Sequence, residues 1–272
     1  MSKIYLITIT ALLLWVLPTF ACTIPGDGQG HGPAMSFTDN HDGTVTDNLT
    51  GLTWTIGRAS DGKVTWSNLH LPAGWGLPNL AEALSIVDYG HRSPAVRTQP
   101  FGPLANMTDG VLDEFWTADG IHTVDENGGG ATTGITQAYL RAVKGAAPCL
   151  ASHYVDNGNG TITDTATNLM WAKVVGVDQT WDEAKGEFIV NLNELAEGGY
   201  TDWRLPDIKE LSTAPAPAVG GWYWSSTPHA QQGGRVPTPN AGITCAWGIS
   251  SPSGWVYHND RGTRHLARAV RP

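Results

Sequence analysis

The sequence predicts an α+β protein built from two similar halves, and three observations lead to this prediction. Residues 37–54 and 154–171 align without gaps at an offset of 117, and nine of their eighteen positions are identical. Shorter motifs then recur in the same order, among them Thr-Trp, Leu-Pro and Arg-Ala-Val. Each half reads as a hairpin, then helices, then several short strands, an order typical of α+β domains with antiparallel sheet.

The length of the repeat sets the domain boundaries. A period of about 120 residues is too long for a solenoid, whose units have about 20 to 50 residues. It is long enough for each half to bury a core of its own. We therefore predict tandem domains at residues 36–145 and 150–272, preceded by a signal peptide at 1–21 and a Gly- and Pro-rich linker at 22–35.

The first 21 residues have the features of a secretory signal peptide. Lys3 is their only charged residue, residues 4–16 are apolar, and small residues precede a cleavage point before Cys22. The apolar run is too short for a lasting transmembrane span. We expect a secreted, extracellular or cell-surface protein, with a periplasmic location as an alternative. Cys22 also allows lipid anchoring, although Thr19 stands where a lipobox has leucine.

Each half is expected to begin with a β-hairpin. Asx-Gly pairs at residues 42–43 and 159–160 lie between alternating residues, and such pairs supply the positive φ angles of a tight turn. A capping box at residues 180–183 predicts a helix that runs to about Ala196. The corresponding helix of the first half is cut short by Pro72.

A second helix is predicted to begin at Pro78 and, in the second half, at Pro206, because proline suits the first helical turn. It runs to Tyr89 in the first half and stops before Pro215 in the second. Tryptophans also recur at matched places, as core residues of a duplicated scaffold would. The expected core tryptophans are Trp54, Trp66, Trp75, Trp116, Trp171, Trp181, Trp203 and Trp224.

An ordered series of motifs in the second half resembles a known family. The motifs are DNGNGTITD (156–164), GYTDWRLP (199–206), KEL (209–211), YWSST (223–227) and RAVR (268–271). They resemble the DUF1566 family, also known as the C-terminal domain of the Legionella collagen-like adhesin, and residues 77–84 and 87–94 extend the resemblance to the first half. It implies a C-type-lectin-like fold, related to that of formylglycine-generating enzymes. In the adhesin it implies binding of sulfated polysaccharide.

The resemblance has departures. Many family members carry a cysteine in the first helix and another in the last strand, where this chain has Phe188 and Ala269. The first half has Trp-Thr-Ala-Asp at 116–119 in place of the Trp-Ser-Ser-Thr motif. We therefore interpret the first half as the eroded, structural copy and the second half as the binding copy.

Charge limits the classes of partner. The formal net charge is −9, and only 15% of the residues are charged. An acidic protein repels nucleic acid and anionic lipid, so neither is an expected partner, and membrane attachment would need a lipid on Cys22. The expected partner is a polysaccharide, sulfated or not, or a surface protein, with self-association as a further alternative.

Candidate ligand-binding residues lie in the late loops of the second half, within 222–264. Aromatic residues there have no counterpart in the first half, and exposed rings can pack against the CH-rich faces of sugars. Guanidinium groups nearby, with His265 beside them, could bind sulfate bidentately or form an ordinary solvated edge. The candidates are Trp222, Trp247, Trp255, Tyr257, His258, Asn259, Arg261 and Arg264. Arg268 and Arg271 belong to the repeated motif and are expected to be structural.

Three cysteines allow one disulfide in an exported protein. If Cys22 carries lipid or frays with the N-terminus, Cys149–Cys245 is the natural pair. A Cys22–Cys149 bond and three free thiols remain the alternatives. The sequence has no Cys-x-x-Cys motif, which leaves little support for redox catalysis or structural zinc.

Calcium is a weak alternative, and we expect no metal and no cofactor. Residues 238–240 and 258–260 have the spacing of the two tripeptides with which calcium-dependent lectins bind sugar. Thr238 lacks the carboxylate or amide oxygen that such a site needs. The acidic hairpin turns lack the closing glutamate of an EF-hand, and turn chemistry explains them.

Catalytic motifs are absent from the sequence, which contains no Gly-x-Ser-x-Gly, no His-Glu-x-x-His and no phosphate-binding glycine loop. A formylglycine-generating type of enzyme would need a cysteine pair, and only Cys245 falls in the late strands. We therefore expect a non-enzymatic recognition or adhesion protein. The alternative is a structural subunit of a surface assembly or filament, and the formylglycine-generating type of catalyst ranks last.

Overall fold

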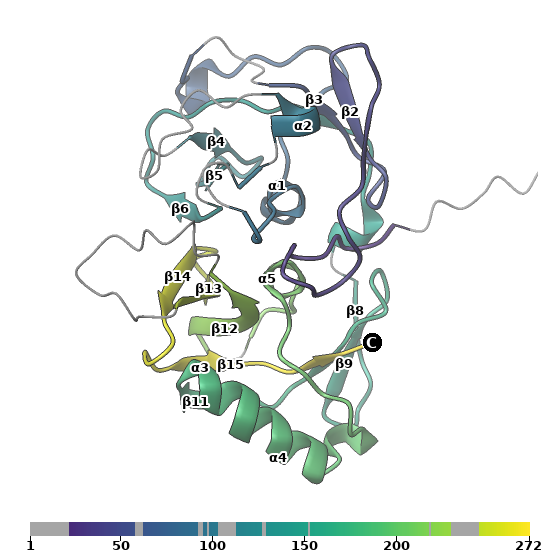
Figure 1. Cartoon of the computed structure of the whole chain (residues 1–272), viewed down its shortest axis with the longest axis vertical. Helices are drawn as coiled ribbons and strands as arrows, with labels where there is room; N and C mark the ends of the chain where they lie inside the picture. The colour runs from purple at the N-terminus through teal and green to yellow at the C-terminus, as the bar shows by residue number, and fades with distance from the viewer. Residues whose placement is uncertain are drawn as a thin grey trace, which may run out of the picture.

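The described residues form an α+β structure of mostly antiparallel sheet with few, short helices (Figure 1). The computed structural model describes residues 22–57, 62–91, 95–96, 98–102, 113–126, 129–151, 153–217, 219–229 and 245–272. The predicted signal peptide and residues 238–240 lie outside these ranges. None of the described helices has the length and apolar character needed to cross a bilayer.

Two four-stranded antiparallel sheets have the same strand order. The first consists of β1 (Phe37–Asp39), β2 (Thr44–Asp47), β3 (Thr53–Thr55) and β7 (Val143–Lys144). The second consists of β8 (Tyr154–Asp156), β9 (Thr161–Asp164), β10 (Met170–Ala172) and β16 (Val270–Arg271). The registers correspond, since Trp54 pairs with Val143 and Trp171 with Val270. The two predicted hairpins are confirmed.

A third sheet of eight strands crosses both halves. Its order is β11 (Gly176–Gln179), β15 (His265–Ala267), β12 (Gly221–Pro228), β13 (Cys245–Ser251), β14 (Val256–Asp260), β6 (Ala131–Thr133), β5 (His122–Asp125) and β4 (Glu114–Trp116). The halves meet where β14 pairs with β6, through Val256 and Ala131. They are therefore joined within one sheet and not by the chain connection alone.

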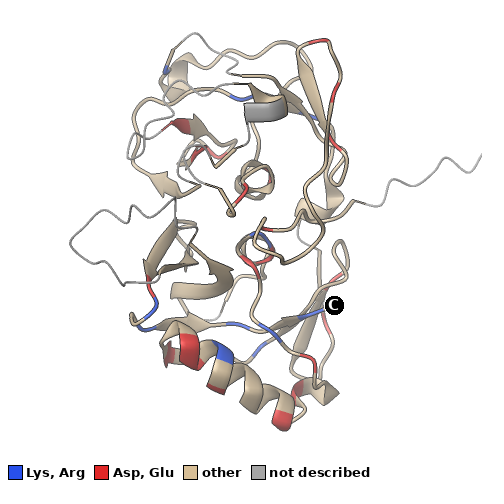
Figure 2. Cartoon of the chain, viewed as in Figure 1, with Lys and Arg blue, Asp and Glu red and all other residues tan. Residues whose placement is uncertain are grey.

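A capping box begins the first helix of the second half at the predicted place. The Thr180 hydroxyl accepts a hydrogen bond from the Glu183 amide at 3.3 Å and starts α3 (Trp181–Glu183). α3 continues through a π-helical turn, η3 (Ala184–Phe188), into α4 (Ile189–Glu194), and Figure 2 shows acidic residues along this helical segment. Its counterpart in the first half is a single 3-10 turn, η1 (Trp66–Asn68).

The second predicted helix begins two residues later than expected in each half, because Pro78 and Pro206 precede the N-caps Asn79 and Asp207 and do not lie in the first turn. α1 (Leu80–Ser85) ends before Tyr89, because the Tyr89 amide donates to the Asp27 carbonyl at 2.9 Å instead of continuing the helix. α5 (Ile208–Ser212) is its counterpart in the second half. The remaining short helices are α2 (Thr98–Phe101), η2 (Pro148–Leu150) and η4 (Glu197–Gly199).

Most of the expected core tryptophans are buried, at 6% exposure or less. These are Trp54, Trp116, Trp171, Trp181, Trp203 and Trp224. The expectation is wrong for Trp66, which is 41% exposed because its helix is reduced to one surface turn. Trp75 is half-buried, with the Lys144 ammonium 4.8 Å from its ring.

One hydrophobic core crosses the boundary between the predicted domains. It contains Leu84 and Val124 of the first half together with Trp171 and Trp247 of the second. Smaller clusters around Trp116 and Trp224 belong to one half each. The expectation that each half buries only its own core is therefore corrected: α1 packs against α5 and β14 pairs with β6, so apolar residues of both halves cover each other.

Residues 22–35 are folded structure and not the predicted linker. Asp27 is fully buried, and its carboxylate accepts a hydrogen bond from the Thr227 hydroxyl at 2.7 Å. The Gln29 side-chain amide donates to the Tyr89 carbonyl at 2.7 Å. Because these bonds reach both halves, the segment is held beside α5, where Figure 1 shows it as the dark purple loop.

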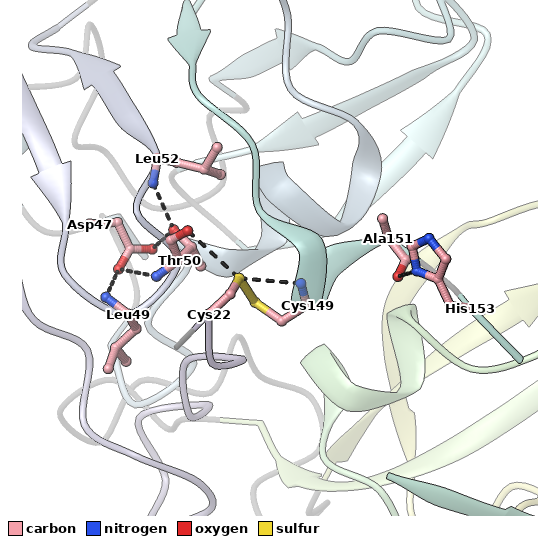
Figure 3. The surroundings of a disulfide bond; sticks show 8 residues. All are labelled: Cys22, Asp47, Leu49, Thr50, Leu52, Cys149, Ala151 and His153. Carbon is pink, nitrogen blue, oxygen red and sulfur yellow. Dashed lines mark hydrogen bonds between the residues drawn. A yellow bond between two sulfur atoms is a disulfide. The ribbon is translucent and has the colours of Figure 1, made fainter. Parts of the chain in front are cut away.

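The structure corrects the expected Cys149–Cys245 disulfide. Cys22 is bonded to Cys149, with 5.4 Å between their Cα atoms (Figure 3), and the Cys245 thiol is free. The reason is the course of residues 22–35, which return the N-terminal end of the described chain to η2 between the halves. Lipid attachment would require the sulfur of Cys22, and in the structure the disulfide occupies it.

Trp171→Ala should destabilise the fold by about 3 to 5 kcal/mol, because a fully buried indole is replaced by a cavity. Trp66→Ala is the control, since its partly exposed ring should contribute about 1 kcal/mol or less. Urea denaturation followed by circular dichroism measures both. An unchanged midpoint for Trp171→Ala would contradict the assignment of this ring to the core.

Stability should fall as pH rises from 4.5 to 7, because desolvation raises the pKa of the buried Glu114 to about 7 from 4.5. In this window the folded chain holds a proton that the unfolded chain has lost, so the contribution is present below pH 4.5 and lost by pH 7. Glu114→Gln should reduce the stability difference between pH 5 and pH 8 by about 1 to 3 kcal/mol. If stability changed with pH equally in the wild type and in Glu114→Gln, the raised pKa would not belong to Glu114.

Candidate functional site

The candidate residues lie on opposite faces of the sheet formed by β12, β13 and β14. Successive side chains of a strand point to opposite faces. Along β14, Val256 is buried in the shared core, and the neighbouring Tyr257 is 55% exposed. Across to β13, Trp247 pairs with His258 and Gly248 pairs with Tyr257. Strand alternation therefore divides the expected site between the core and the surface.

Trp247 and His258 belong to the inner face. Trp247 is 3% exposed, and its ring packs edge-on against Tyr89 at 5.0 Å and against His258 at 5.5 Å. The His258 ring also lies 4.0 Å from that of His229. A ring enclosed in this way has no free face for a sugar, so the expectation that Trp247 contacts ligand is corrected.

Trp222 and Trp255 reach the opposite face. The exposed Tyr257 ring lies at the free edge of β14, where it stacks on His258 with 4.6 Å between the ring centroids. We call the surface formed by Trp222, Trp255 and Tyr257 the aromatic face. Trp255 is 42% exposed and Tyr257 55%, and Trp222 is half-buried. Trp222 pairs with Ser250 of β13, and the Ser250 amide donates to the Trp255 carbonyl at 2.8 Å. Trp222 and Trp255 therefore flank the same residue of the middle strand, about 10 Å apart across two strand spacings.

Two small residues outside the expected set shape the aromatic face. Gly248 and Ser250 occupy the middle strand between the rings of β12 and those of β14. A Cβ atom on Gly248 would lie 2.7 Å from the Tyr223 carbonyl oxygen, so only glycine fits here. The alternation of small residues with Trp247 and Ile249 along β13 is the sequence signal that could have identified this strip.

Neighbouring residues hold the rings in place. The Trp255 indole N–H donates to the Thr133 hydroxyl of β6 at 2.7 Å, so the first half fixes one edge of this ring. The Trp222 ring lies 6.0 Å from His265, whose pKa is lowered by burial. His265 is thus biased towards the neutral form and adds no strong positive charge beside the rings.

The basic candidates are engaged with the helical segment that begins at α3. Arg264 lies 3.2 Å from Asp178 and 3.0 Å from Glu183. The guanidinium of Arg261 lies 4.0 Å from the Trp181 ring. In Figure 2 basic and acidic residues are interleaved along this edge. Arg264 is therefore paired with carboxylates and does not form with Arg261 the free sulfate-binding pair that we expected. Arg261 contacts the Trp181 ring, and its Nε has no hydrogen-bond partner in the described part of the chain.

The remaining candidates are placed as follows. Asn259 is half-buried on β14. Cys245 pairs with Asp260, and its pKa is raised, first by burial and then by the charge of Asp260. These surroundings favour the thiol over the nucleophilic thiolate. Within the described ranges, no group of three or more His, Cys, Asp or Glu side chains is arranged to hold a metal ion.

Residues 160–271 match the family described as the Lcl C-terminal domain. The match begins beside β9, ends within β16 and includes the whole aromatic face. It supports an Lcl-like family for the second half, the half in which the resemblance is strongest. No curated protein matches the chain.

Releasing Arg264 from its carboxylate partners should create a basic site at this edge. Asp178→Asn combined with Glu183→Gln removes both carboxylates and keeps a glutamine suited to the capping box. We expect this variant to need more salt for elution from a heparin column, because the guanidinium becomes free to bind sulfate.

The increase should disappear when Arg264→Ala is added to the two substitutions. Arg264→Ala alone should leave elution unchanged, because its charge is already paired. A large loss of retention from that single substitution would show that Arg264 contacts sulfate directly.

Proposed function

We propose that this chain is an exported, non-enzymatic recognition protein of the adhesin type, which binds polysaccharide through the aromatic face of its second half. The observation that carries the proposal is the exposure of Trp255 and Tyr257, at 42% and 55%, side by side on β14 and the residue before it. Aromatic rings presented in this way can pack against the CH faces of sugars while their polar edges form hydrogen bonds. The match of residues 160–271 to the Lcl C-terminal domain supports it.

We also propose that the two halves are tandem copies with a C-type-lectin-like fold. The equal strand order and register of the two small sheets support this interpretation. The Cys22–Cys149 disulfide is consistent with an oxidising compartment, as expected for a secreted or surface protein. We propose further that binding needs neither calcium nor another cofactor.

Trp255→Ala with Tyr257→Ala should lower affinity for the polysaccharides that the wild-type protein selects on a glycan array by at least about tenfold. The matched control is Trp66→Ala, which removes a tryptophan of similar exposure, 41%, from the first half. The control should bind as the wild type does, and EDTA should have no effect. Equal losses in the double variant and in the control would exclude the aromatic face as the binding site.

The same exposed rings favour one second function, a structural subunit of a surface assembly. Apolar side chains elsewhere are exposed as well, among them Ile121 at 61% and Leu195 at 68%. Size-exclusion chromatography over a range of concentrations distinguishes the two functions. If the wild type formed polymers and the variant Trp255→Ala with Tyr257→Ala did not, the aromatic face would be assigned to self-association. A wild type that elutes as one discrete species and binds glycan supports recognition.

A further inference from the structure

A pocket lies on the inner side of the long sheet, away from the aromatic face. Its volume is about 140 Å³, and it is bounded by α5, residues 214–217 and the adjoining parts of β12 and β13. Most of its walls are apolar, with Leu211, Ile249 and Pro252 among them. Leu80 of α1 contributes a wall from the first half.

The charged residue of this pocket is Arg268, which is 4% exposed. Its Nη1 donates to the Pro215 carbonyl, and its guanidinium carbon lies 5.3 Å from the Trp171 ring. Among the described residues no carboxylate forms an ion pair with Arg268, and its Nε has no hydrogen-bond partner. A guanidinium has five N–H donors, and buried charges are normally paired, so this arginine lacks a partner of the usual kind.

The first half shows what the usual partner is. Arg141 occupies the matching place in the repeated Arg-Ala-Val motif and is 1% exposed. Its Nε and Nη2 both donate to the carboxylate of Glu126 at 2.5 Å, and its Nη1 donates to the Thr55 carbonyl at 2.9 Å. The two arginines thus share a position in the fold, but among the described residues only Arg141 has an acidic partner.

The pocket lies where the second half lacks that acid. Glu126 directly follows β5, and in the second half the chain leaves the corresponding strand, β13, at Ser251 and Pro252. Both residues line the pocket. The space beside Arg268 is therefore bounded by a serine and a proline at the point in the topology where the first half has its glutamate.

We propose that this pocket binds the carboxylate of a small organic anion, which forms with Arg268 the bidentate pair that Glu126 forms with Arg141. A planar carboxylate matches the guanidinium fork, and Ser251, which lines the pocket, carries a hydroxyl group that can add a hydrogen bond. The apolar walls favour a ligand with an apolar body. This site is separate from the aromatic face and does not depend on the function proposed for it.

Benzoate is a suitable probe, and benzamide is its neutral counterpart of nearly equal shape. Calorimetric titration of the disulfide-bonded protein should detect benzoate binding in the millimolar range or tighter. Benzamide should bind at least about tenfold more weakly, because it cannot form the charged pair. Equal affinities, or no heat of binding with benzoate, would overturn the proposal.

Two variants locate the binding. Ala216 is exposed and lines the pocket, so Ala216→Phe should fill the pocket and lower benzoate affinity at least about tenfold without disturbing Arg268. Arg271→Gln removes an equal charge from an arginine that pairs with Asp202 at the surface, and should leave affinity unchanged. If Ala216→Phe bound benzoate as well as the wild type does, or if Arg271→Gln lost as much affinity as Ala216→Phe, the assignment of benzoate binding to this pocket would be overturned. If inorganic sulfate bound the pocket as tightly as benzoate does, the pocket would be a general oxyanion site and the proposed specificity for carboxylates would be overturned.

Discussion

Burial of apolar side chains from both halves in a single core is the constraint on which the rest of this structure depends. Lys209 shows how closely the halves fit. This residue of α5 is 2% exposed, and its ammonium group donates to the Ser85 carbonyl of the opposite half at 2.7 Å. Burial lowers its pKa to about 8, although acidic residues of both halves oppose the change. Separating the halves would expose the core and leave this charge without its partners.

The same constraint explains why the first half matters to a candidate site that it does not carry. The aromatic rings lie on the second half, yet β14 is held by β6, and the Trp255 indole is held by Thr133. A domain cut at the predicted boundary would lose these contacts.

Repetition allows positions to be compared within one molecule. Arg141 and Arg268 share a motif and a place in the fold, but only Arg141 has an internal carboxylate. Trp66 and Trp181 also share a place in the repeat, but only Trp181 begins a helical segment of several turns and is buried, whereas Trp66 reaches the surface. Equivalent residues thus differ in exposure and pairing when the elements that cover them differ, even where the motif is retained.

The sequence by itself determined the features that depend on near neighbours: the turns at Gly43 and Gly160, the capping box at Thr180, and most of the repeated core tryptophans. These follow from chemistry within a few residues or from the repeat. Only the tertiary structure decided the partner of Cys22, the packing of residues 22–35 and the opposite fates of Trp247 and Tyr257. Those outcomes depend on contacts between distant residues and on strand register, where a shift of one residue would exchange the buried and exposed faces.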